Sequence, residues 1–166
     1  RHAPAWLEPF LSSSLTVTTV LAIVLNLIMR IGISRRATLK VTSGEHSSDI
    51  VFRFMEDLGA SWGARKEVVY RAVAAMNEFA EAIVHCGMDG RQVLMTAVFD
   101  ELSLDIRITY EGPPVEFPEE RPDMAAIIDD PEALARMSGF LVRHFTDRIR
   151  MSREGERTRV DLHFDH

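Results

Sequence analysis

The feature that most limits how this chain can fold is a run of twenty residues without a charged side chain, from Phe10 to Met29. A helix of about twenty residues is about 30 Å long, which matches the hydrocarbon thickness of a bilayer. The basic residues near this run all follow it: Arg30, Arg35, Arg36 and Lys40. The positive-inside rule places such residues on the cytoplasmic side. We therefore expect residues 1–35 to contain a membrane-spanning helix with its flanks, set in the inner (plasma) membrane, and the rest of the chain to be cytoplasmic.

Two other interpretations of this run are less favoured. A signal peptide carries its basic residues before the apolar core, whereas here they come after it. A buried helix of a globular core is seldom apolar all round over such a length. The first half of the run is also rich in hydroxyl side chains: Ser12, Ser13, Ser14, Thr16, Thr18 and Thr19. Such side chains are common where membrane helices pack together, so we expect further transmembrane helices as partners.

The segment FLSSSLTVTTVLAIVLNLI resembles the last transmembrane helix of the nucleobase–cation symporters, the xanthine/uracil permease family, with a Ser-rich beginning and an LNL end. The resemblance covers about 20 residues of apolar sequence. It implies that the chain is the C-terminal part of a transporter whose other membrane helices lie upstream.

The charge of the chain is divided unevenly between its two parts. Residues 1–40 carry five basic residues and one acidic residue, whereas residues 41–166 carry fourteen Arg and Lys against twenty-four Asp and Glu. A region with a net charge of −10 lacks the clustered cations that bind DNA or RNA, so we expect no nucleic-acid partner. Cys86 is the only cysteine and cannot form an internal disulfide.

The hydrophobic periodicity beyond residue 35 alternates between helix and strand patterns. A stripe with helical spacing is clearest at 65–85, and alternation with period two is clearest at 102–110, where Leu102, Leu104, Ile106, Ile108 and Tyr110 should share one face. The expected elements in order are a short strand at 38–41 within a polar connector (36–48), helices at 49–60 and 65–85, strands at 93–99 and 102–110, a helix at 130–146, and strands at 148–152 and 158–164. Asp130 and Pro131 are good residues for the start of the third helix.

This order predicts an α+β fold over residues 49–166, a two-layer α/β sandwich with a mostly antiparallel sheet and helices on one face. The other face of the sheet should be exposed to solvent. We expect its charged side chains to form cross-strand ion pairs and not a binding patch: Arg107, Arg148, Arg150 and Arg159 with Asp105 and Asp161.

Three segments in this region resemble, in the same order, the motifs of the GHKL ATPases, and among these the anti-sigma-factor serine kinases. They are AAMNEFAEAIVHCG (74–87), DIRITYEGPPVEF (105–117) and ALARMSGFLVRHFTDRI (133–149). The family motifs read E-x-x-x-N-A-x-x-H, D-x-G-x-G and G-x-G-L-x-L-V. In that family the Glu of the first motif is the general base, its Asn binds magnesium, and the Asp of the second motif binds the adenine amino group.

In the first motif, the match at Ala82 and His85 places Asn77 at the position of the general base and Glu81 at the position of the magnesium ligand. An Asn side chain cannot accept a proton as a general base. Glu81 could still bind Mg²⁺, which prefers oxygen ligands. Glu78 is a poor replacement for the base, since one residue along a helix points about 100° away. The resemblance therefore implies a site with no catalytic residue.

The second and third motifs are altered as well. Gly112 is kept, but Tyr110 replaces the Asp that would bind adenine, and Arg136-Met137-Ser138 replaces the Gly-x-Gly sequence before Gly139. Residues 111–132 hold eight carboxylates and one arginine, which disfavours a triphosphate. We expect a degenerate nucleotide site whose candidate residues are Asn77, Glu81, Tyr110, Gly112, Ser138 and Gly139.

These inferences predict a cytosolic regulatory or interaction domain, with no cofactor, attached to a permease-like transporter and binding a cytosolic protein. The alternative is an active kinase of the serine or histidine type that binds Mg·ATP at the membrane. A sensor histidine kinase would need a long dimerisation segment before the ATPase domain, and residues 34–48 are too short for one. A membrane adaptor with a single anchor is a third possibility.

Overall fold

A computed structural model of the chain describes residues 14–30, 34–44, 47–100, 102–123 and 130–166. The chain forms two compact units, Arg1–Ile33 and Ser34–His166. The described part of the first unit is one helix, α2 (Ser14–Arg30), in which the Thr18 and Thr19 hydroxyls donate to the carbonyl oxygens of Ser14 and Leu15 at 2.7 and 2.9 Å.

Helix α2 covers most of the run in which we expect a membrane-spanning helix. The first part of that run, Phe10–Ser13, lies outside the described residues. Within the residues that the structure describes, no helix has both the length and the apolar character needed to cross a bilayer.

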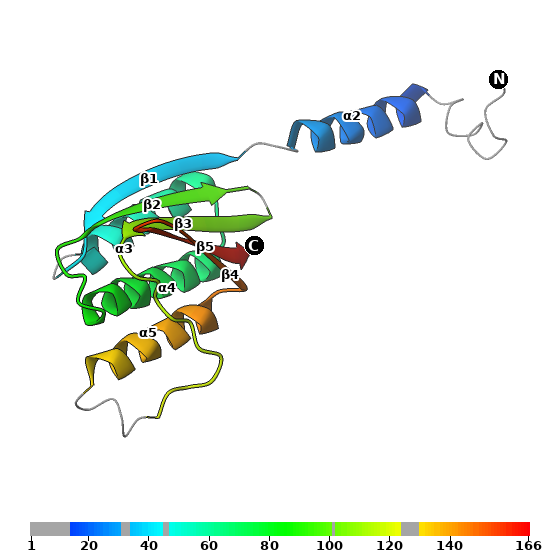
Figure 1. Ribbon diagram of the computed structural model, residues 1–166. Coiled ribbons are helices and arrows are strands. Elements are labelled where there is room, and N and C mark those ends of the chain that lie inside the picture. The colour runs from blue at the N-terminus through cyan, green and yellow to red at the C-terminus, as the bar shows by residue number, and fades with distance from the viewer. Residues whose placement is uncertain (1–13, 31–33, 45–46, 101, 124–129) are drawn as a thin grey trace. The chain divides into compact units, whose positions relative to one another are not determined.

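The second unit is a five-stranded sheet in the order β1-β2-β3-β5-β4, in which every neighbouring pair is antiparallel. Helices α3, α4 and α5 all lie on one face of this sheet (Figure 1). The elements are β1 (Arg35–Thr42), α3 (Ser47–Trp62), α4 (Lys66–His85), β2 (Gln92–Phe99), β3 (Ser103–Glu111), α5 (Pro131–Phe145), β4 (Arg148–Glu154) and β5 (Arg157–Asp165). The predicted α+β fold, with an antiparallel sheet and helices on one face, is confirmed.

Helix α4 is the centre of the core. The predicted stripe on this helix is buried throughout, at Val69, Val73, Met76, Ala80 and Ile83. Further side chains outside that stripe are also buried, including Ala72, Ala75, Phe79 and Ala82. The buried face is wider than one stripe because α3, α5 and the sheet all contact this helix.

Three details differ from the sequence prediction. The strand expected at 38–41 extends over Arg35–Thr42 and pairs with β2 along its whole length, so part of the expected connector belongs to the sheet. In the helix expected at 49–60, the spacing of Ile50, Phe54 and Leu58 predicts that these three face the core. Phe54 and Leu58 do pack against it, but Ile50 is 45% exposed, and α3 buries Val51 and Met55. Leu102 is 79% exposed because β3 starts only at Ser103.

The turn before β3 explains the exposure of Leu102. The Asp100 carboxylate accepts hydrogen bonds from the backbone amides of Leu102 and Ser103, at 2.9 and 2.7 Å. Burial alone would raise the pKa of Asp100, but these hydrogen bonds lower it below its usual value. Leu104, Ile106, Ile108 and Tyr110 do face the core, as predicted.

Candidate functional site

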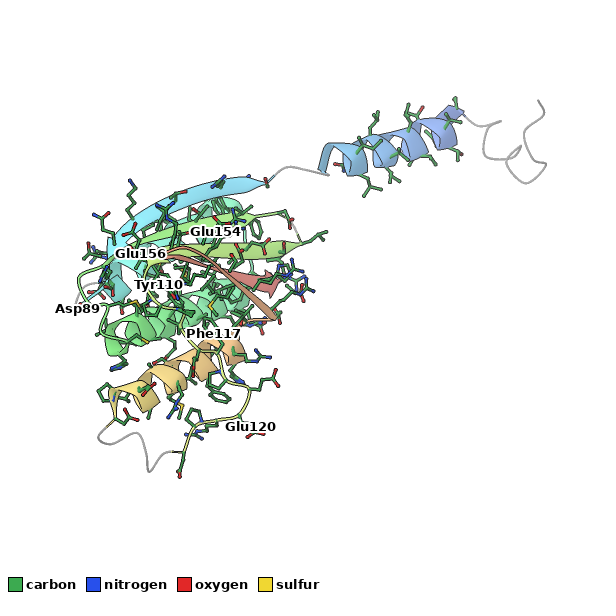
Figure 2. All side chains as sticks on the ribbon, viewed as in Figure 1. Asp89, Tyr110, Phe117, Glu120, Glu154 and Glu156 are labelled. Carbon is green, nitrogen blue, oxygen red and sulfur yellow. The ribbon has the colours of Figure 1, made fainter. Side chains whose placement is uncertain are left out.

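The predicted site residues of β3 and α5 lie beside the loop that follows β3, which contacts Tyr110 and Gly139. Residues 113–118 follow β3 and run between the core and α5. Figure 2 shows Tyr110 and Phe117 in this region. The Phe79 ring on α4 packs edge-on against Tyr110, with 5.7 Å between ring centroids, and stacks on Phe117 at 6.3 Å. The altered motifs are therefore brought together around the loop.

Tyr110, at the position of the adenine-binding Asp, anchors this loop. Its hydroxyl donates to the carbonyl oxygen of Pro113 at 3.1 Å and accepts from the backbone amide of Val115 at 3.2 Å. Val115 is 1% exposed. Burial of the phenol raises the pKa of Tyr110 to about 12. A neutral phenol with both hydrogen-bonding functions in use is a structural anchor for residues 113–115.

Gly112, the retained glycine of the second motif, is required by close packing. Its φ of 152° is one that side-chain-bearing residues rarely adopt, and a Cβ there would lie 2.3 Å from the Met88 Sδ. Its amide donates to the Glu156 carbonyl at 2.9 Å, and its carbonyl accepts from the Thr158 hydroxyl at 2.7 Å. This glycine joins the end of β3 to the β4–β5 turn.

Ser138 and Gly139 on α5 let the loop approach the helix. A Cβ on Gly139 would lie 1.9 Å from the backbone oxygen of Glu116, so only a glycine allows the loop to lie there. Ser138 is buried, and its interaction with the Glu78 side chain on α4 acts to lower the pKa of Glu78. These residues, which the family motif would use to surround phosphate, here pack against protein atoms.

The first motif is divided between two environments. The Asn77 Oδ1 is buried and has no hydrogen-bond partner among the described residues, whereas Glu81 is exposed and lies 3.9 Å from the Nε2 of His85. Burial, followed by the repulsion of Glu81, raises the pKa of Glu78, although its interaction with Ser138 opposes the shift. The described residues contain no group of three or more His, Cys, Asp or Glu side chains that could hold a metal ion.

A pocket of about 470 Å³ remains open beside the loop, between the end of α4 and the start of α5. Glu116, Asp130 and Glu132 line it, with Arg136 as its one arginine. Burial, together with the charges of Glu116 and Glu132, raises the pKa of the Cys86 thiol at its rim. An acidic pocket of this kind repels polyphosphate, in agreement with the charge count of the sequence.

The sequence did not predict how four residues contribute to this site: Glu78, Phe79, Val115 and Phe117. A signal for the last two was present, because Val115 and Phe117 alternate in PPVEFP within an otherwise acidic loop. Such an isolated apolar pair indicates a packed loop. Glu78 meets α5 because α5 covers that side of α4, which periodicity within one helix does not reveal.

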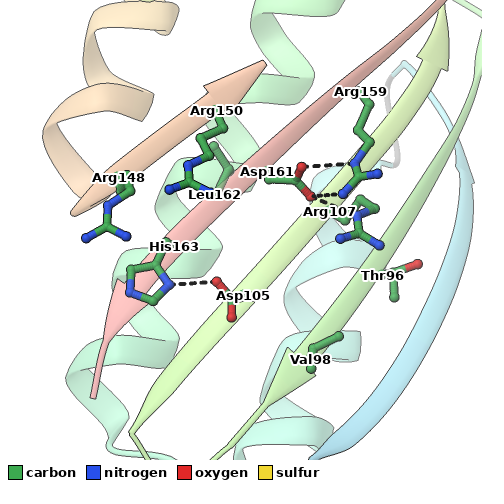
Figure 3. A pocket seen from close by; sticks show the side chains of 10 residues that line it. All are labelled: Thr96, Val98, Asp105, Arg107, Arg148, Arg150, Arg159, Asp161, Leu162 and His163. Carbon is green, nitrogen blue, oxygen red and sulfur yellow. Dashed lines mark hydrogen bonds and ion pairs between the residues drawn. The ribbon is translucent and has the colours of Figure 1, made fainter. Parts of the chain in front are cut away.

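The uncovered face of the sheet holds a second cluster, around a pocket of about 340 Å³ (Figure 3). Asp161 binds Arg107 across the strands at 2.7 Å, as predicted, and it also binds Arg159 of its own strand at 2.9 Å, which is not a cross-strand pair. Burial alone would raise the pKa of Asp161, but these two guanidinium groups lower it. His163, not predicted, binds Asp105 through Nδ1 at 2.6 Å, and this hydrogen bond raises the pKa of His163.

Arg148 and Arg150 on β4 were also predicted to form cross-strand pairs, and here the prediction was wrong. Neither makes an ion pair within the described part of the chain, although Arg150 stands opposite Asp161 in the sheet register. The reason is competition, since the single carboxylate of Asp161 is already bound by two guanidinium groups. Figure 3 has no dashed line from either side chain to the other residues drawn.

Comparison with known proteins identifies the fold. No protein-family model and no curated protein matches the chain. A crystal structure of the RsbU and RsbW domains of Rv1364c from Mycobacterium tuberculosis is similar, with a TM-score of 0.54 and 12% sequence identity. The similarity covers 78% of this chain and 32% of that one.

This likeness supports a GHKL-like fold for residues 34–166. At this level of identity the likeness extends to the architecture alone. It agrees with the resemblance of the three motif segments, and no comparison supports the permease resemblance of the first thirty residues.

Proposed function

We propose that residues 34–166 form a regulatory or interaction domain with a GHKL-like nucleotide site that is closed, because residues 113–118 of the same chain pack into it. The observation that carries this proposal is the contact between Gly139 and the Glu116 backbone, which puts the loop directly on α5. A phosphate-binding loop must leave its amides open to the ligand. In this domain the corresponding place holds residues 113–118.

The energy of the loop's packing opposes nucleotide binding. Releasing the loop would expose Val115, at a cost of about 1.5–3 kcal/mol. It would also remove the two hydrogen bonds of the Tyr110 hydroxyl, which contribute about 1 kcal/mol each. Since each 1.4 kcal/mol is about tenfold in affinity, loop release alone would weaken nucleotide binding by two decades or more. The missing base at Asn77 removes turnover in addition.

The same proposal attaches this domain to a membrane transporter, with the resemblance of residues 10–28 to the xanthine/uracil permeases as its support. In α2 the large apolar side chains are all exposed within the first unit: Leu15, Val17, Val20, Leu21, Ile23, Val24, Leu25, Leu27 and Ile28. Further transmembrane helices would cover such a surface. A 166-residue chain that remains monomeric and in solution without detergent would contradict this part of the proposal.

Calorimetric titration of the 166-residue chain with Mg·ATP, in detergent micelles, tests the closed site. We expect a Kd above about 1 mM, which is about −4 kcal/mol. The matched variant Glu81→Gln, which removes the candidate magnesium ligand, should titrate identically.

A Kd at or below about 10 μM, lost in Glu81→Gln, would contradict the closed site. That result would support the alternative, a membrane-anchored kinase that binds Mg·ATP. The fold likeness to a structure containing an RsbW domain is the observation that keeps this alternative under test.

A further inference from the structure

Strand β4 is the most exposed strand of the sheet and forms one of its two edges. Among the residues that the structure describes it pairs only with β5, and every residue of β4 except Ile149 is exposed. An edge strand presents alternate backbone N–H and C=O groups that another strand can pair with. The outer edge of β4 therefore has the hydrogen-bonding groups needed to accept a sixth strand.

The outer side of this edge is basic. Arg148 and Arg150 lie on the uncovered face, beside His163 and Asp161 of β5, and have no carboxylate partner within the described residues. The nearest carboxylates are already bound, because Asp161 holds Arg107 and Arg159 while Asp105 holds His163. Cross-strand neighbours of Arg148 and Arg150 on an added strand would therefore meet two unneutralised cations about 5 Å away.

The inner side of the same edge carries Ile149, Met151 and Arg153, and it is apolar at Ile149 and Met151. Met151 lies on the helix-covered side, opposite Val160, and is 44% exposed. It borders a pocket of about 330 Å³ whose other walls are Pro114, Val115, Glu116, Phe117 and Pro118. An exposed methionine beside two prolines and a phenylalanine is a surface that favours an apolar side chain.

We propose that the edge of β4 is a docking site for an extended segment of a partner protein in which acidic and apolar residues alternate. The added strand would pair with the β4 backbone. Its carboxylates would lie on the outer face near Arg148 and Arg150, and its apolar side chains would enter the pocket beside Met151. Main-chain pairing supplies affinity in such complexes, and alternate side chains supply specificity. The arginines also discriminate, since they repel basic strands.

This interaction uses none of the candidate nucleotide-site residues, so it can be tested in the absence of nucleotide. The opposite edge, β1, provides an internal control. Arg36 and Lys40 are basic side chains of that strand and lie at the same register levels as Val98 and Leu94 of β2. The pocket that Met151 borders has no β1 residue among its walls.

The test is fluorescence anisotropy of a labelled, capped peptide of sequence Glu-Val-Glu-Val-Glu-Val-Glu with the 166-residue chain in detergent. The double variant Arg148→Glu/Arg150→Glu should weaken binding at least tenfold, and Arg36→Glu/Lys40→Glu should change it less than twofold. A peptide in which Lys replaces Glu should bind the Arg148→Glu/Arg150→Glu variant more tightly than the unaltered chain. That exchange of preference cannot arise from a misfolded variant. Hydrogen exchange of β4 amides should slow when the acidic peptide binds.

Several results would overturn the proposal. A peptide of the same composition without alternation, Glu-Glu-Val-Val-Val-Glu-Glu, that binds equally well would reduce the interaction to general charge attraction. Equal losses in both double variants would do the same. A dimer of the chain that forms without peptide and is lost in Arg148→Glu/Arg150→Glu would make a second copy the occupant of this edge.

Discussion

The two faces of the sheet are built from the same strands but differ in burial and in the contacts that their side chains make. On β3, Ile106 is 1% exposed and packs in the core, while its neighbour Arg107 lies on the open face and pairs with Asp161. Three helices and the loop 113–118 pack on the covered side of the sheet. The open face carries a cluster of ion pairs and, beside them, Arg148 and Arg150, which have no carboxylate partner within the described residues. The comparison teaches that alternate residues of one strand serve two kinds of contact, core packing on one face and exposed ion pairs on the other.

The largest expected effect comes from neighbouring substitutions on β3. Ile106→Ala should lower the free energy of unfolding by about 2–5 kcal/mol, since it leaves a cavity in the core. Arg107→Ala should lower it by about 0–1 kcal/mol, because the ion pair that it removes is exposed to solvent. Denaturant titration of both variants measures this difference. Equal losses would show that the two faces do not differ in energy as described.

The substitution Gly139→Ala tests the packing of residues 113–118 on α5, on the covered side of the sheet. Alanine usually stabilises a helix relative to glycine by about 1 kcal/mol. Here its Cβ would collide with the Glu116 carbonyl, so we expect a destabilisation of about 1–3 kcal/mol and faster hydrogen exchange at Val115. Arg136→Ala, an exposed substitution on the same helix, is the control and should leave Val115 unchanged. A stabilised Gly139→Ala variant would show that the loop does not lie on α5.

A smaller loss is expected from Tyr110→Phe. The Pro113 carbonyl and the Val115 amide would each lose the phenol as a partner, which should cost about 1–2 kcal/mol. The control is Tyr70→Phe, since Tyr70 is 62% exposed, and its thermal midpoint should not move. If Tyr110→Phe is as stable as the parent, the hydroxyl does not anchor the loop.

The smallest effect concerns the open face and depends on pH. The pKa of His163 is raised above 6.5 by its hydrogen bond to Asp105. The pair of protonated His163 with Asp105 therefore stabilises the folded state fully below pH 6.5, and this stabilisation is lost as the pH rises through the raised pKa. Relative to His163→Gln, the parent should melt higher at about pH 5.5, and this advantage should shrink by about pH 8.5. An advantage that grows with pH would contradict the assigned ion pair.

The fold could be read from the sequence where one periodicity decided the structure. The stripe of α4, the alternation of β3 and the capping of α5 by Asp130, whose carboxylate accepts from the Glu132 amide at 2.9 Å, follow local rules. The first residue of β3 was missed because the Asp100 side chain sets the turn. For α3 the prediction was wrong at Ile50 alone, since Phe54 and Leu58 pack against the core while Val51 is buried and Ile50 is exposed.

The site could be predicted only in part. The sequence identified the motif positions, and the structure brings Tyr110, Gly112, Ser138 and Gly139 around one segment. It could not show that residues 113–118 fill the space, because this depends on a contact between Gly139 and a backbone atom 23 residues away in sequence (139 − 116). Likewise, the free Arg148 and Arg150 result from a competition for Asp161 that pairwise charge matching does not describe.

The segment 113–118 lies between two sites, the proposed nucleotide site beside α5 and the pocket beside β4. One of its sides rests on α5, where Glu116 meets Gly139, and Pro114 and Phe117 border the pocket at Met151. A molecule that displaced this segment to enter the proposed nucleotide site would also remove the pocket beside β4. By thermodynamic linkage the reverse holds to the same degree, so a segment seated at β4 would hold the nucleotide site shut. Two ligands that never touch would then exclude one another through a single short piece of chain.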